Sequence, residues 1–325
     1  SLARRSLTPV PKRMRASSYA VVSVPMQQRS IMVPSLAVAG SGLLWGIWWI
    51  PLRWLESKGL SGDWASVAIY ATASVAMAPY ILVRWRKLLG GGSDVVLVGL
   101  LSGAAFSAWN HALIGGDVVR VTLLFYLAPV WGTGFGVLFF RDPVSSWRLL
   151  SIVLGLSGAA VVLGLEGGLP LPRNLPEWMA LASGVLFALA AICSRRSPAA
   201  VGLEKTFLNC VFGGIVSLGM AVQLGTAAAP SVPSAAGSAL PILVCLIWQI
   251  PVTWALLWGA TRLDAGRIGI LLLLEVLGAA VSAAILTDEP FGWREAFGCT
   301  LIIAAGLTEG LDEIRQRRAL RRAAG

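Results

Sequence analysis

Ten long apolar segments, separated by short turns, constrain this chain more than any other feature of its sequence. Each is about as long as the ~20 residues that a transmembrane helix needs. The breaks between them carry glycine, proline or aspartate, as at Gly90 to Asp94, and such residues mark turns. The pattern predicts an all-α polytopic membrane protein with ten transmembrane helices, at residues 35–55, 62–83, 94–113, 118–140, 147–165, 175–194, 203–224, 239–260, 265–287 and 291–311.

Composition excludes the main alternative classes. Hydrophobic residues make up 56% of the chain and charged residues 13%, about half the charged fraction of a soluble domain. This apolar content excludes a disordered protein, and four cysteines in 325 residues are too few for a secreted disulfide scaffold. The net charge of +10 does not indicate nucleic-acid binding, because the basic residues lie at the ends of the apolar segments and in the tails, as the positive-inside rule requires.

The positions of the basic residues predict the orientation in the membrane. With the N-terminus inside, 21 of the 26 Lys and Arg residues fall on the inner side and 5 on the outer side. Both termini are therefore expected in the cytoplasm, and we expect a bacterial inner (plasma) membrane protein. Residues 1–34 carry six Arg or Lys and no acid, which is typical of a disordered basic tail or of a transit segment. Residues 312–325 are expected to form a basic C-terminal tail.

The sequence contains an internal repeat. Residues 120–143 align without a gap with residues 267–290, at an offset of 147, so that Arg120 matches Arg267 and Pro143 matches Pro290. The alignment divides the chain into a first repeat at 35–165 and a second at 175–311, with five predicted helices in each. Because five is odd, the two repeats must lie in opposite orientations in the membrane. Inverted repeats with a substrate site between them are typical of secondary transporters.

These features resemble the drug/metabolite transporter superfamily, and within it the ten-helix members of the EamA type. The resemblance covers about residues 35–311 and rests on Leu44-Trp45-Gly46, the stretch Leu124-Phe125-Tyr126-Leu127-Ala128-Pro129 after Arg120, Trp147-Arg148, and Leu274-Glu275-Val276. It implies a secondary transporter that works by alternating access and exports or exchanges small metabolites. Amino acids are the favoured class, and some members resemble exporters of aromatic amino acids.

Glu275 is the first candidate for a functional residue. It lies deep inside an apolar segment, where a charge costs about 2.5–3.5 kcal/mol on insertion scales. It is expected to face a cavity or a partner, or to be protonated, so it is a candidate for binding a substrate amine and for proton coupling. A structural hydrogen bond to a neighbouring helix is the alternative. Tyr126 and Pro129 share one face of the fourth predicted helix, where Pro129 leaves a backbone carbonyl without its donor.

Tryptophans give the next candidates. Trp48, Trp109 and Trp254 lie on predicted helices, and Asn110 follows Trp109. Tryptophan is enriched at membrane interfaces, but an inward ring would stack on a flat substrate, which favours aromatic compounds. His111, which is the chain's single histidine, is a second coupling candidate because its side chain titrates near neutral pH. A solvated or capping role at the edge of a loop is the alternative for His111.

Enzyme functions find little support in the sequence. Gly155-Leu156-Ser157-Gly158 matches the GxSG of intramembrane serine proteases, but His111, the one possible base, is expected near the opposite membrane face. No metal-binding or nucleotide-binding motif is present in the sequence, so we expect no metal, no cofactor and no enzyme. The expected partners are a small-molecule substrate and the lipid bilayer. A membrane protein that moves no solute, such as a receptor, or a lipid scramblase stays open as the alternative.

Overall fold

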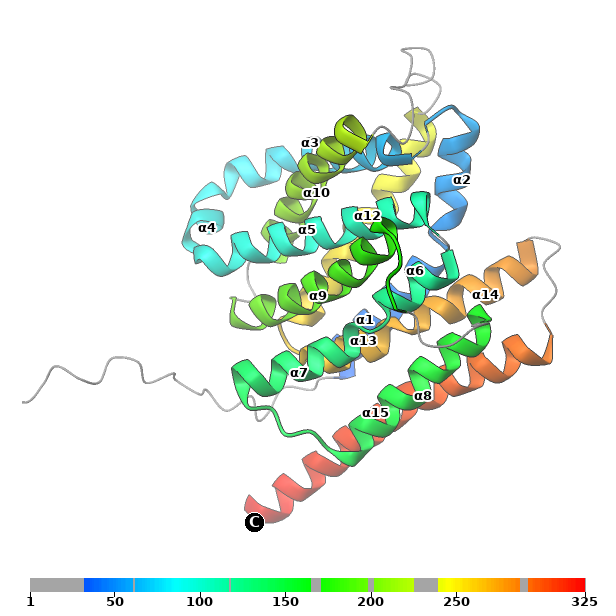
Figure 1. Ribbon diagram of the computed structural model, residues 1–325. Coiled ribbons are helices and arrows are strands. Elements are labelled where there is room, and N and C mark those ends of the chain that lie inside the picture. The colour runs from blue at the N-terminus through cyan, green and yellow to red at the C-terminus, as the bar shows by residue number, and fades with distance from the viewer. Residues whose placement is uncertain are drawn as a thin grey trace, which may run out of the picture. The chain divides into compact units, whose positions relative to one another are not determined.

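The computed structural model describes residues 32–60, 62–116, 118–164, 171–197, 202–224, 239–286 and 292–324, and every regular element in these ranges is a helix (Figure 1). The part of the predicted tail before residue 32, and the turn predicted between residues 287 and 291, lie outside the described residues. The helices are α1 Met32–Gly46, α2 Trp49–Ser57, α3 Gly62–Val83, α4 Trp85–Gly90, α5 Gly92–Gly115, α6 Val118–Phe125, α7 Ala128–Phe140, α8 Ser146–Leu163, α9 Leu175–Arg196, α10 Gly202–Leu224, α12 Ala239–Ala260, α13 Ala265–Leu272, α14 Leu274–Leu286 and α15 Trp293–Ala324.

Nine stretches of the described residues are long and apolar enough to cross a membrane. Three of them combine two helices each: α1 with α2, α6 with α7, and α13 with α14. The tenth long helix, α15, has 32 residues and carries more charge, and it packs along α8 (Figure 1). The sequence placed the start of a C-terminal tail at residue 312, whereas α15 continues as one helix to Ala324.

The interruptions of the three composite spans have local causes. Proline has no amide hydrogen and cannot donate to the carbonyl four residues earlier. Pro51 follows the turn at Ile47–Trp48, and Pro129 follows the turn at Tyr126–Leu127. The third interruption, at Leu273, has no proline. Its backbone hydrogen bonds span three residues instead of four: Leu273 donates to Ile270, and Val276 donates to Leu273.

The repeat that the sequence predicts reappears in these interruptions. Helices α6 and α13 each have eight residues, and α7 and α14 each have thirteen. At the offset of 147, the bounds of α6 map onto those of α13, and Tyr126 maps onto Leu273. The fourth span of each repeat is therefore broken at the same position.

The two repeats interleave rather than stand side by side. Helix α1 packs against α12, α13 and α14, and α5 packs against α9 and α10. Helix α7 lies against α13, and α8 lies against α15 (Figure 1). Most of the contacts between the described helices thus join one repeat to the other, and a pocket between the repeats is lined by both.

Candidate functional site

A pocket with about 380 Å³ of empty space, part of it open to solvent, lies between the two repeats. Its walls are mainly aromatic and apolar, with one amide and one carboxyl group. The lining residues are Trp45, Phe106, Trp109, Asn110, Phe125, Leu256, Leu272 and Glu275.

The pocket lies where the three interrupted spans meet. Trp45 immediately precedes the break between α1 and α2, and Phe125 is the last residue of α6. Leu272 and Glu275 stand on either side of the break between α13 and α14. Discontinuous helices whose ends meet at a cavity between repeats form the substrate sites of many secondary transporters.

Glu275 is the single ionisable residue among those that line the pocket. Its carboxyl group accepts a hydrogen bond from the hydroxyl of Tyr126, which is buried. Within the described ranges, no basic side chain forms an ion pair with Glu275. The pocket therefore has one carboxyl group that a ligand's cation or a proton would have to neutralise.

The aromatic rings that line the pocket pack against one another, and one of them also packs against a ring outside the lining. Trp45 packs 5.5 Å from Phe106 and 5.3 Å from Trp48, measured between ring centroids. Trp109 lies 5.8 Å from Phe125. The indole N–H groups of Trp45 and Trp109 are buried and find no hydrogen-bond acceptor among the residues that the structure describes. Since an unmet buried donor costs about 1–3 kcal/mol, these two groups are available to an acceptor on a ligand.

The structure brings three of the sequence candidates, Trp109, Asn110 and Glu275, into the pocket lining, and Tyr126 contacts Glu275 from behind. Trp48 is not in the lining, because it packs on the far side of Trp45 in the turn between α1 and α2. The remaining two candidates also lie elsewhere.

Pro129 and Trp254 do not line the pocket. Pro129 packs against α13, where a Cβ on Gly269 would lie 2.7 Å from its Cα. The carbonyl that Pro129 leaves free, on Phe125, faces α9 at Gly184. Trp254 is 37% exposed and lies 6.1 Å from Trp258, beside the start of α10 at Gly202.

The sequence offered two roles for His111: coupling to protons, or a solvated or capping position at the edge of a loop. The structure places His111 inside a helix and away from solvent. It is buried in the last turns of α5, and its Nδ1 lies 2.8 Å from Oδ2 of Asp63, which is also buried. The neighbouring Asn110, a pocket residue, donates to the hydroxyl of Ser66 on the same helix as Asp63, at 3.1 Å. The expectation of a solvated histidine was wrong because α3 covers this end of α5.

Sequence reasoning missed five lining residues: Trp45, Phe106, Phe125, Leu256 and Leu272. Trp45 and Phe125 could have been found, since each lies a few residues before a proline in the first turn of the next half-helix. Nothing in the local pattern separates the two leucines from other apolar positions. No group of three His, Cys, Asp or Glu side chains suited to a metal ion occurs in the described ranges.

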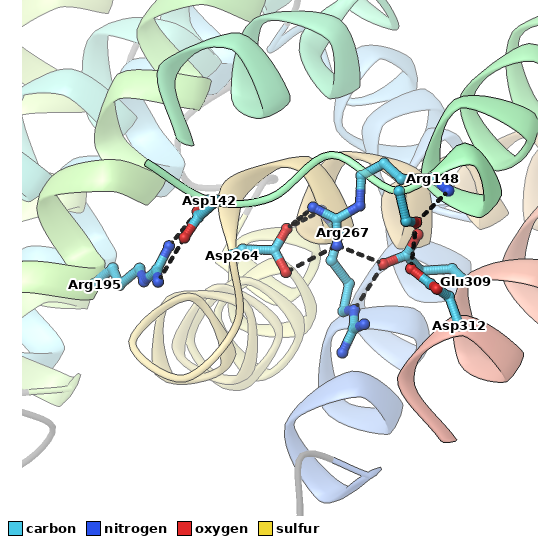
Figure 2. A network of polar contacts seen from close by, with 8 residues as sticks. Asp142, Arg148, Arg195, Asp264, Arg267, Glu309 and Asp312 are labelled. Carbon is cyan, nitrogen blue, oxygen red and sulfur yellow. Dashed lines mark hydrogen bonds and ion pairs between the residues drawn. The ribbon is translucent and has the colours of Figure 1, made fainter. Parts of the chain in front are cut away.

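A second polar feature is a network of ion pairs where α9 ends and α13 begins (Figure 2). The guanidinium of Arg148 pairs with Asp264, at 2.5 and 3.1 Å, and with Glu309, at 2.8 Å. Glu309 also accepts from Arg267, at 2.9 Å. Burial acts to raise the pKa of Asp264, but Arg148 and Arg267 outweigh burial and hold this pKa below its usual value.

Asp142 extends this group of charges. It forms a two-bond pair with Arg195, at 2.5 and 3.0 Å, and both side chains are less than one-fifth exposed. The backbone of Arg141, in the turn that the sequence predicts between residues 140 and 147, is left-handed, with φ of 56°. The turn thereby directs Asp142 toward α9, and Figure 2 shows this pair beside the Arg148 network.

Two interleaved repeats, with nine candidate spans and the long helix α15 among the described residues, surround a pocket where three spans are interrupted, and this arrangement is typical of a membrane transporter. The chain belongs to the EamA-like transporter family, whose model matches residues 32–164 and again residues 174–307. This confirms the resemblance to the drug/metabolite transporter superfamily and the two repeats.

Individual relatives agree with this assignment. The chain is 23% identical over 310 residues to a Bacillus subtilis (strain 168) protein named "Uncharacterized transporter YojE", covering 90% of this chain and 99% of that protein. A solved crystal structure, described only as that of a protein, superposes with a TM-score of 0.64 at 19% identity. It covers 87% of this chain and 98% of its own, and at that identity it supports the fold alone.

Proposed function

We propose that this transporter exports or exchanges small metabolites that carry an amine, with aromatic amino acids as the leading class. The observation that carries the proposal is the pocket at the three helix interruptions, whose described lining residues combine aromatic rings with one carboxyl group and include no basic side chain. We further propose that the two repeats expose this pocket to the two sides of the membrane in turn. The protein would lie in a bacterial plasma membrane with both termini in the cytoplasm.

The lining residues suggest how such a substrate would bind. The carboxylate of Glu275 would accept from the ammonium group, which forms a strong charge-assisted hydrogen bond. The rings of Trp45, Phe106, Trp109 and Phe125 would enclose the aromatic body, in stacked or edge contacts. The free indole N–H groups of Trp45 and Trp109 would donate to the substrate's carboxylate.

Glu275 also offers a basis for coupling to protons. A lone carboxyl group in an apolar pocket is far more stable when a proton or a cation neutralises it. If a proton and the substrate's amine compete for this one carboxyl group, the transporter carries the amine across the membrane in one direction and a proton in the other. The hydrogen bond from Tyr126 holds the carboxyl group in one orientation for both.

Counterflow in proteoliposomes tests the proposal. Vesicles are preloaded with tryptophan, tryptamine, N-acetyltryptophan, nucleobases or organic cations, and entry of the labelled compound is followed. We expect accumulation with tryptophan and tryptamine, and none with N-acetyltryptophan, because acetylation removes the ammonium group that Glu275 binds. Folded protein that accumulates none of these compounds would contradict the proposal and favour a receptor or a scramblase.

The matched variants are Glu275→Gln and Glu56→Gln. Losing a charge-assisted hydrogen bond of about 1.5–3 kcal/mol lowers affinity by roughly 10- to 150-fold, so Glu275→Gln should lose transport and its pH dependence. Glu56 is exposed on α2 and does not line the pocket, so its variant should transport normally. Normal transport and unchanged pH dependence in Glu275→Gln would leave Glu275 a purely structural role.

A further inference from the structure

The ion pairs at the end of α9 and the start of α13 join the two repeats. Arg148 and Asp142 belong to the first repeat, whereas their partners Asp264, Glu309 and Arg195 belong to the second half of the chain. Three inter-repeat contacts between opposite charges therefore gather in one region (Figure 2). We call this region the charged face.

The charged face lies beyond one end of the pocket. Arg267, in the network, and Leu272, in the pocket lining, are five residues apart on α13, which corresponds to a rise of about 7.5 Å. Between them, α13 and α7 touch through their backbones. A Cβ on Gly132 would lie 2.6 Å from the carbonyl oxygen of Ala265, and a Cβ on Gly269 would lie 2.7 Å from Pro129. In this conformation α7 and α13 leave little space between the charged face and the pocket.

Two residues of the charged face or next to it also cap helices, at the starts of α8 and α13. Asp264 is the N-cap of α13, where its Oδ1 accepts from the amide of Arg267 at 2.9 Å. Ser145 is the N-cap of α8, and its hydroxyl also donates to Asp312 of α15 at 2.6 Å. A relative movement of α8 and α13 would thus break the contacts between Arg148 and Asp264 while leaving both helices intact.

We propose that the ion pairs of the charged face form the gate that closes the pocket on that side of the membrane. The proposal rests on the alternating access put forward above. Paired charges suit a gate because water solvates each group once the helices part. The same contacts between apolar groups would leave exposed hydrophobic surface in the open state.

A second ion pair between the repeats lies at the opposite end of α9. There Arg120 of the first repeat forms a two-bond pair with Glu177 of the second, at 2.8 and 3.0 Å. Glu177 and Arg195 are 18 residues apart on α9, or about 27 Å along the helix, so the two inter-repeat pairs lie near opposite membrane faces. Weakening either group should shift the carrier toward the state that is open on the same side.

Cysteine accessibility tests the gate without any substrate. The four native cysteines are replaced by serine or alanine, and Leu272→Cys places a reporter in the pocket lining. A membrane-impermeant maleimide is added to either side of proteoliposomes whose protein orientation has been determined. In this background, Asp142→Asn and Arg195→Gln are compared with the charge swap Asp142→Arg/Arg195→Asp and with the control Glu56→Gln.

The expected result is directional. Each single variant should raise labelling from the charged face by about tenfold, as the loss of a charge-assisted pair shifts the population. The swap should restore labelling to near the parent rate, and Glu56→Gln should not change it. Glu177→Gln should raise labelling from the opposite face only. Folding of each variant is checked by gel filtration and thermal melting, and if Arg195→Gln does not fold, Asp142→Asn carries the test.

Three results would overturn the gate: unchanged labelling in the folded single variants, an equal rise from both faces, or a swap that does not restore the parent rate. The control Glu56→Gln separates a local effect from general loosening of the protein. Because labelling needs no substrate, it also separates this inference from the proposed function. Directional labelling with no counterflow would reject the substrate assignment and keep the gate.

Discussion

The crossing of α1 and α14 makes a strong prediction for Gly46→Ala. A Cβ on Gly46 would overlap the carbonyl oxygen of Glu275, and it would lie 2.6 Å from the amide nitrogen of Ala279 and 2.9 Å from the carbonyl carbon of Gly278. All three are backbone atoms, so no side chain can rotate away. Restoring an ordinary contact of about 3.4 Å would require the two helices to move apart by roughly 1 Å, and overpacking of this kind costs about 1–3 kcal/mol.

The displaced helices carry Trp45 and Glu275, so the substitution should affect transport as well as stability. A misplacement of about 1 Å at a binding site can cost roughly 100-fold in activity. We therefore expect Gly46→Ala to lower the melting temperature and to reduce counterflow by one to two orders of magnitude, that is about 10- to 100-fold. Both measurements are made on purified protein, in detergent for melting and in proteoliposomes for transport.

Gly40→Ala is the matched control. It lies on the same helix, and a Cβ there would meet nothing within 4 Å. Because alanine favours the helix over glycine by up to about 1 kcal/mol, this variant should be at least as stable as the parent and should transport normally. The steric reasoning would be refuted if Gly46→Ala melted and transported like Gly40→Ala.

Two further predictions concern buried charges. Because the pKa of Asp264 is lowered in the folded protein, its stabilising effect is complete at neutral pH and is lost as the pH falls below about 4. The melting temperature of the parent should exceed that of Asp264→Asn at pH 7, and a gap that did not shrink toward pH 3 would contradict the assignment. Lys205 is fully buried, and within the described part of the chain its ammonium makes only long bonds to Ser194, at 3.3 and 3.4 Å. Replacing such a charge by an apolar group often stabilises a protein, so Lys205→Met should raise the melting temperature, and a fall would mean that capping of α9 outweighs the cost of burial.

The architecture was largely predictable from the sequence. Segment length and the repeat at an offset of 147 predicted the spans and their grouping, because bilayer thickness and duplication leave direct marks on a sequence. Glu275 was found for a similar reason, since a carboxyl group inside an apolar span is rare and costly. Leu256 carries no such mark in the sequence, because a leucine in an apolar span is ordinary and its place in the pocket depends only on how α12 packs.

Other parts of the site depended on contacts that no local pattern encodes. Trp45 and Trp48 are three residues apart, yet only Trp45 lines the pocket, because the chain turns between α1 and α2. His111 is buried because α3 supplies Asp63 across 48 residues of sequence. The partner of Asp142 proved to be Arg195, again through a turn whose direction depends on one left-handed residue.

The interruptions at Tyr126–Leu127 and Leu273 have a consequence for how cheaply the protein can change shape. Bending a continuous helix breaks hydrogen bonds in an environment without water to replace them. Here the bonds that span four residues are already replaced by bonds that span three, as between Leu273 and Ile270. The half-helices can therefore pivot with little further loss of hydrogen bonds. Since the two hinges occupy equivalent positions in the repeats, a duplication would have supplied both together, and Leu273 keeps its bend without the proline that accompanies the first.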